Sequence, residues 1–226
     1  MTHTAILFGS IGTLAETSEL QRRAYNAAFA AHDLDWVWER QRYYRMLNRP
    51  GGRARLADYA VDAGQSVDVD AVHATKERVF ASLVDRSGLE PRPGVVETIS
   101  TARHRGVPVG LCTTTTPAQV GLVLDGLAPH VTQVDFDWVG DVTMVDRPKP
   151  APDIYLAALD ALGLKPAGVL AIEDTPESAE AARAAGLSVV GFPGEAGKGR
   201  AFPSDAPVVD RLGAHIVDGN LKLAAE

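Results

Sequence analysis

Four short apolar runs, each ending at small or polar residues, constrain the fold of this chain more than any other feature. They cover residues 5–8, 107–112, 169–172 and 188–192. Runs that are apolar on both faces of a strand are typical of buried strands in a parallel sheet. The runs end at Gly9, Thr113, Glu173 and Pro193. These strand ends are the first places to look for function.

Segments with apolar residues at helical spacing lie between the strand-like runs. They cover 95–105, 117–127, 153–162 and 176–185. A strand–helix–strand order implies a parallel sheet with helices on both faces. The sequence therefore predicts an α/β fold with a Rossmann-like, doubly wound parallel sheet. Ligands of such sheets bind beyond the carboxyl ends of the strands.

One long stretch, residues 17–88, interrupts this alternation. Apolar residues recur at helical spacing around 20–31 and 72–84, and no strand pattern lies between them. The sequence thus predicts two domains. Residues 1–16 and 89–226 form the α/β core, and residues 17–88 form an inserted helical cap.

Composition narrows the class of protein. The chain has 226 residues and a formal net charge of −7, which argues against a general nucleic-acid binder. Cys112 is the only cysteine, which excludes an intrachain disulfide and a zinc site built from cysteines. No apolar run reaches the roughly 20 residues of a membrane span, and no signal-peptide pattern opens the sequence. We expect a cytoplasmic monomer with no nucleic-acid or membrane partner.

Four motifs stand at the predicted strand ends. They are Gly-Ser-Ile-Gly-Thr-Leu at 9–14, Thr113, Lys-Pro-Ala-Pro-Asp at 149–153 and Glu-Asp at 173–174. In this set the sequence resembles the haloacid dehalogenase superfamily over nearly the whole chain. Within it, Glu16-Thr17, Gly51-Gly52-Arg53 and the threonines at 113–116 are similar to CbbY-type sugar bisphosphate phosphatases, near phosphoglycolate phosphatase and β-phosphoglucomutase. The resemblance implies a small phosphorylated metabolite, such as xylulose-1,5-bisphosphate, as partner.

The same resemblance exposes a departure at the end of the first strand. The family forms an aspartyl-phosphate on a first Asp, and an Asp two places later acts as general acid and base. These positions are Gly9 and Ile11 here, and neither side chain performs that chemistry. Ser10 lies between them. Because side chains alternate along a strand, Ser10 is expected to point away from the direction of its two neighbours, which argues against it as a substitute nucleophile.

A magnesium site is implied by the family and is weakened by the same departure. Of the expected ligands, the carbonyl of Ile11 and the carboxylates of Glu173 and Asp174 remain. A hard cation with fewer anionic ligands binds weakly. The alternative is that Lys149 pairs with Asp174 and the pocket neutralises itself, since buried charges are normally paired.

The residues that would hold a phosphate are retained. The resemblance assigns the Thr113 hydroxyl, the amide of Thr114 and the Lys149 ammonium to the phosphoryl oxygens. A purely structural alternative is that the threonines cap a helix that begins at Pro117.

The predicted cap is locally basic although the chain is acidic. Arginine recognises phosphate through paired N–H donors. Six arginines fall in a stretch without an acid: Arg40, Arg42, Arg45, Arg49, Arg53 and Arg55. Arg53 stands where the resembled subgroup has a substrate-contacting lysine, so it is a candidate for a distal phosphate. Glu16, at the predicted hinge, is a candidate for a sugar hydroxyl. A solvated helix face and an exposed linker acid are the respective alternatives.

Three hypotheses follow from these patterns. The first is a phosphatase homologue that binds a phosphate ester without hydrolysing it. The second is an active phosphohydrolase with a substitute nucleophile. The third is an interaction protein that retains only the fold, because function depends on the site and not on the fold.

Overall fold

The computed structural model describes residues 3–9, 11–48, 51–195 and 197–220. The chain divides into two compact units. One contains the segments up to Glu16 and from Leu89 onward, and we call it the core unit. The other, Thr17–Gly88, we call the helical unit.

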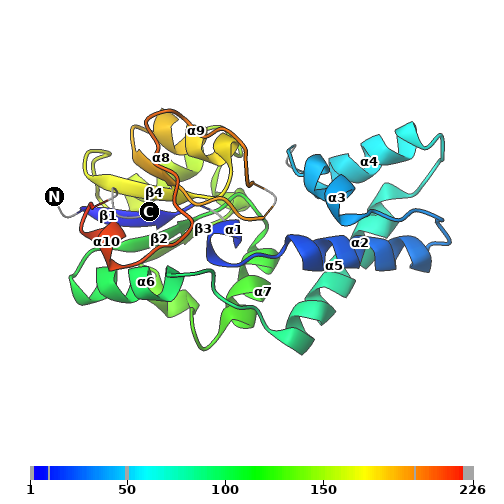
Figure 1. Cartoon of the computed structure of the whole chain (residues 1–226), viewed down its shortest axis with the longest axis horizontal. Helices are drawn as coiled ribbons and strands as arrows, with labels where there is room; N and C mark the ends of the chain where they lie inside the picture. Colours follow the sequence, from blue (N-terminus) through cyan, green and yellow to red (C-terminus); the bar gives the residue numbers. More distant parts are fainter. Residues whose placement is uncertain (1–2, 10, 49–50, 196, 221–226) are drawn as a thin grey trace. The chain divides into compact units, whose positions relative to one another are not determined.

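A five-stranded, fully parallel sheet lies at the centre of the core unit, in the order β3-β2-β1-β4-β5 (Figure 1). The strands are β1 (Ala5–Phe8), β2 (Val109–Cys112), β3 (Trp138–Gly140), β4 (Val169–Glu173) and β5 (Ser188–Gly191). Every residue of β1, β2 and β4 is buried, as expected for central strands. The α/β class predicted from the apolar runs is confirmed.

Helices cover both faces of this sheet. Figure 1 shows α8 (Asp153–Ala161) and α9 (Pro176–Ala184) over one face, and α6 (Val95–His104) and α10 (Ala214–Val217) over the other. The remaining elements of the core unit are the helix α7 (Pro117–Leu127) and the short elements α1 (Ile11–Leu14), η1 (Gln133–Asp135) and η2 (Val142–Met144). The side chains of Thr116 and Thr175 cap α7 and α9 by accepting hydrogen bonds from the backbone.

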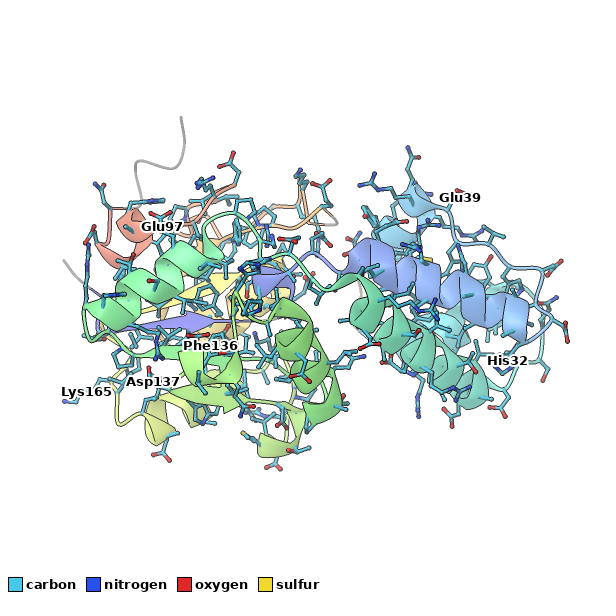
Figure 2. The ribbon with its side chains drawn as sticks, turned by 90° about the horizontal axis from the view of Figure 1, so that it is seen from below. His32, Glu39, Glu97, Phe136, Asp137 and Lys165 are labelled. Carbon is cyan, nitrogen blue, oxygen red and sulfur yellow. The ribbon has the colours of Figure 1, made fainter. Side chains whose placement is uncertain are left out.

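Polar side chains fix the ends of several core elements. Glu97 of α6 accepts a hydrogen bond from the Ala214 N–H, which opens α10 (Figure 2). Asp137 accepts one from the Val109 N–H at 2.8 Å, where β2 begins. These contacts hold the start of α10 to α6 and the start of β2 to the residue that precedes β3.

The helical unit contains four helices: α2 (Ser18–Ala31), α3 (Arg40–Met46), α4 (Gly52–Asp62) and α5 (Val69–Ser87). Helices α2 and α5 pack along each other, and the His32 ring nitrogen lies 2.9 Å from the Thr75 hydroxyl. Trp38 is fully buried at the centre of an aromatic cluster, 4.6 Å from Tyr25 and 5.7 Å from Tyr43 between ring centroids. Among the described helices, none has the length and apolar character needed to cross a bilayer.

Candidate functional site

The register of the central strands brings together, at one edge of the sheet, the predicted site residues that follow β1, β2 and β4. Phe8 of β1 lies opposite Leu111 of β2 and Ile172 of β4. The Gly9 N–H donates to the Ile172 carbonyl at 2.9 Å, so the chain after β1 runs directly beside Glu173.

Three polar side chains meet there in a buried cluster. Lys149 and Glu173 form an ion pair with 2.7 Å between Nζ and Oε1, and their side chains are 7% and 0% exposed. The Tyr155 hydroxyl donates to the same carboxylate oxygen. Lys149 also donates to the Gly9 carbonyl, and its Nζ lies 3.1 Å from the Tyr155 oxygen. We call these three residues the Lys149–Glu173–Tyr155 cluster.

This ion pair corrects one sequence-based expectation. The self-neutralising pair was assigned to Lys149 and Asp174, whereas the structure pairs Lys149 with Glu173. The reason is the register, because Glu173 is the last residue of β4 and lies against the β1 end from which the Gly9 carbonyl points to Lys149. Tyr155 was missed as a site residue. Its place in the first turn of α8, two residues after the Lys-Pro-Ala-Pro-Asp motif, is the signal that identifies it.

Burial dominates the electrostatics of the cluster. Loss of hydration raises the pKa of Glu173 to about 7, with Lys149 acting in the opposite direction. Burial also raises the pKa of Tyr155 well above its usual value, and the neighbouring Glu173 charge adds to that effect. Glu173 Oε2 is buried and has no hydrogen-bond partner among the described residues. The carboxylate is therefore held through one oxygen only.

The end of β1 is shaped by the absence of a side chain at residue 9. A Cβ placed on Gly9 would lie 2.0 Å from Glu173 Cδ, so the Glu173 carboxylate fills the space where that side chain would begin. Ile11 opens the single turn of α1 and is half-buried. Ser10, considered as a substitute nucleophile, lies outside the described residues.

Thr113 and Thr114 follow β2 at the same edge of the sheet. Thr113 is buried, and its Oγ1 accepts a hydrogen bond from the Thr115 N–H at 3.2 Å. Thr114 is half-buried. The capping of α7 falls to Thr116, whose side chain accepts from the Gln119 N–H at 3.4 Å. Capping therefore occupies Thr116 and not Thr113.

The donor set at this edge does not fit the magnesium ion that the family generally uses. Glu173 has one orphaned buried oxygen, but its other oxygen is already held by Lys149 and Tyr155. A divalent cation beside the Lys149 ammonium would meet a positive charge and a carboxylate that is already neutralised. Within the described residues no three His, Cys, Asp or Glu side chains group in a way that could hold a metal.

Glu16 and Arg92 form hydrogen bonds that connect the loops after β1 and after β5 at this edge of the sheet. The Glu16 carboxylate accepts a hydrogen bond from the Glu195 N–H at 2.7 Å, in the loop after β5. Arg92 donates to the carbonyls of Gly12 and Phe192 at 2.8 Å and of Pro193 at 2.7 Å. Sequence reasoning missed Arg92, although an arginine between two prolines at the return from the helical segment marks it.

Three of these arginines in the helical unit contact neighbouring residues of that unit. Arg53 pairs with Asp70 at 3.0 Å, and both side chains are exposed. Arg55 donates to the Met46 carbonyl at 3.1 Å, and Arg42 lies 4.7 Å from the centroid of Tyr59. Arg49 lies outside the described residues.

Comparison with known proteins places the chain and its fold in one family. Residues 3–186 match the sequence model of haloacid dehalogenase-like hydrolases. The chain belongs to the haloacid dehalogenase-like hydrolase family. Among curated haloacid dehalogenase-like relatives, it is 40% identical to the plasmid-borne protein CbbY of Cupriavidus necator over 197 residues, which are 84% of this chain and 78% of the relative. It is 36% identical to CbbY of Rhodobacter capsulatus, over 88% of both chains.

Solved structures of the family agree. A variant of CbbY from Rhodobacter sphaeroides in complex with xylulose-1,5-bisphosphate superposes with a TM-score of 0.82 at 33% identity, covering 92% of this chain and 94% of that one. CbbY from the same organism in complex with phosphate gives the same values. The resemblance drawn from the strand-end motifs is thus confirmed at the level of the family and of its CbbY-type members.

Proposed function

We propose that this chain is a CbbY-like phosphatase homologue that binds a small phosphorylated sugar without hydrolysing it. The observation that carries the proposal is the end of β1. Residues 9 and 11 offer a hydrogen atom and a hydrocarbon side chain where the resembled chemistry begins with two carboxylates. Without a nucleophile, the covalent route is closed, and without an acid, the leaving oxygen is not protonated.

The retained strand-end groups support the binding half of the proposal. Thr113, Thr114 and Lys149 supply a hydroxyl, an amide and an ammonium, the donor types that hold phosphoryl oxygens. The solved CbbY structures contain phosphate and a sugar bisphosphate, which indicates the class of ligand to test. Glu16 and Arg53 stay predictions as ligand contacts. In the structure Glu16 anchors the Glu195 backbone and Arg53 pairs with Asp70.

Two measurements on the purified protein test the proposal. Calorimetry with xylulose-1,5-bisphosphate should give measurable binding, and Thr113→Val should weaken it by about tenfold because a hydroxyl donor is lost. Thr101→Val, on α6, serves as the matched control and should leave the affinity unchanged. A phosphate-release assay on the same ligand with magnesium present should show no turnover. Absence of binding heat with every sugar phosphate overturns the proposal.

One observation favours the third hypothesis, in which only the fold is retained. The Lys149–Glu173–Tyr155 cluster satisfies the Lys149 ammonium from within the protein. If wild-type protein binds neither phosphate nor sugar phosphates, this alternative replaces the binding proposal. Turnover of a phosphate ester would instead support the second hypothesis, an active hydrolase with a substitute nucleophile.

A further inference from the structure

The Glu173 carboxylate occupies space that belongs to residue 9. A Cβ on Gly9 would lie 2.0 Å from Glu173 Cδ, 2.1 Å from Oε1 and 2.3 Å from Oε2. Non-bonded atoms do not approach this closely, so a side chain at residue 9 and the observed position of Glu173 exclude each other. The glycine is therefore what permits the carboxylate to sit here.

Glu173 is also one of three partners that occupy the hydrogen-bond donors of Lys149. An ammonium group has three N–H donors. Lys149 Nζ contacts the Gly9 carbonyl, the Tyr155 hydroxyl and Glu173 Oε1. With these three partners in place, no donor of Lys149 is left for an external anion.

We infer that Glu173 is an internal anion that closes this site: its carboxylate fills the space beside Gly9 and holds Lys149, so that a phosphoryl group gains Lys149 only by displacing it. The inference rests on the proposed function, because it describes how the proposed phosphate site is regulated. The contact is autoinhibitory, and the ligand class it competes with is a phosphate monoester or inorganic phosphate.

The balance of contacts makes displacement feasible. One oxygen of Glu173 is held by Lys149 and Tyr155, while Oε2 is buried without a partner among the described residues. A carboxylate that leaves this position regains water at both oxygens, which offsets part of the lost ion pair. A phosphoryl group that takes its place satisfies Lys149 in turn.

Calorimetry with inorganic phosphate in the presence of EDTA tests the inference. Glu173→Ala should bind phosphate at least about tenfold more tightly than wild type, since the competing anion is gone. Glu180→Ala, an exposed position on α9, makes the same change in net charge and should leave the affinity at the wild-type value. Glu173→Ala combined with Lys149→Ala should lose the gain, which places the anion at Lys149.

Gly9→Ala supplies a second and independent variant. Its methyl group takes the space of the Glu173 carboxylate, so it should also tighten phosphate binding while Glu173 itself is retained. A folded Glu173→Ala or Gly9→Ala protein that binds phosphate no more tightly than wild type overturns the inference.

The outcomes also separate this inference from the proposed function. If the wild type binds sugar phosphates and neither variant binds phosphate more tightly, the proposed function stands and the inference that Glu173 acts as an internal anion is wrong. If the wild type does not bind sugar phosphates but both variants bind phosphate more tightly than wild type, the proposed function is wrong and the internal-anion inference stands.

Discussion

Glu173 and Gly9 share one side-chain space at the edge of the sheet: the carboxylate of the first lies where the side chain of the second would begin. Gly9 follows β1 and Glu173 ends β4, the adjacent parallel strand, so the contact follows from the register of the two strands. A glycine without a side chain and a glutamate whose carboxylate fills that space are therefore parts of a single arrangement.

The first prediction concerns the stability of Gly9→Ala. The added methyl group forces Glu173 out of its ion pair, and we expect a loss of about 1–3 kcal/mol in the free energy of unfolding. Gly121→Ala is the control, because nothing lies within 4 Å of a Cβ at that helical position. It should be neutral or stabilising by about 0.5–1 kcal/mol. Urea unfolding measures both.

The coupling between the two sites sharpens that test. In the Glu173→Ala background the methyl group meets no carboxylate, so Gly9→Ala should cost clearly less there than in wild type. Equal costs in the two backgrounds would show that residues 9 and 173 do not compete for space.

The second prediction concerns Lys149. Its removal leaves the Glu173 carboxylate buried without a cation, and we expect Lys149→Ala to lose about 3–5 kcal/mol of stability. Lys165 is exposed and points away from the core unit in Figure 2. Lys165→Ala should change stability by less than about 0.5 kcal/mol. Similar values for the two lysines, measured by denaturant titration, would contradict the buried ion pair.

The third prediction is a pH dependence. Burial raises the pKa of Glu173 to about 7 from its ordinary 4.5, so the native state binds a proton that the unfolded state releases. Between these values stability falls as pH rises, by up to about 3 kcal/mol, and the loss is complete above the folded-state pKa. Glu173→Gln does not ionise. The unfolding free energy of wild type minus that of this variant should therefore rise as the pH is lowered from about 7.5 to about 4.5. A difference independent of pH would show an ordinary Glu173 pKa.

The fourth prediction concerns Arg92. Arg92→Met keeps the aliphatic length but leaves three carbonyls without their charged donor, and we expect a loss of about 2–4 kcal/mol. The exposed Arg211 is the matched control, and Arg211→Met should be close to neutral. Thermal unfolding of both variants gives the comparison. If Arg92→Met melts at the same temperature as the control, the three hydrogen bonds make no net contribution to stability.

The α/β class could be predicted because buried parallel strands leave uninterrupted apolar runs in the sequence. Strand β3 left no such signal. It has three residues, two of them half-buried at the sheet edge, and a run that short does not stand out from its neighbours. The helices flanked by proline and glycine were predictable for the same local reason, since their ends are encoded next to them.

The site divides in the same way. Its members could be predicted one strand end at a time, and the family resemblance indicated which of them matter for phosphate chemistry. The contacts among these residues could not be predicted. The partner of Lys149 depends on the register between β1 and β4 and on the space left by Gly9, and Tyr155 reaches the cluster from α8. These are relations between distant segments, since Gly9 and Lys149 are 140 positions apart in the chain.

Arg92 joins more than two loops. It contacts the carbonyls after β1 and after β5, and its own N–H donates to the Leu14 carbonyl at 2.8 Å while Pro91 bridges Ala15. Segments fastened at one point open together, so amide hydrogen exchange around residues 12–15, 91–92 and 192–193 should report a single opening event with one protection factor. The loops around the site would then open as one cooperative unit, and the rate of that shared opening would set the rate of ligand entry.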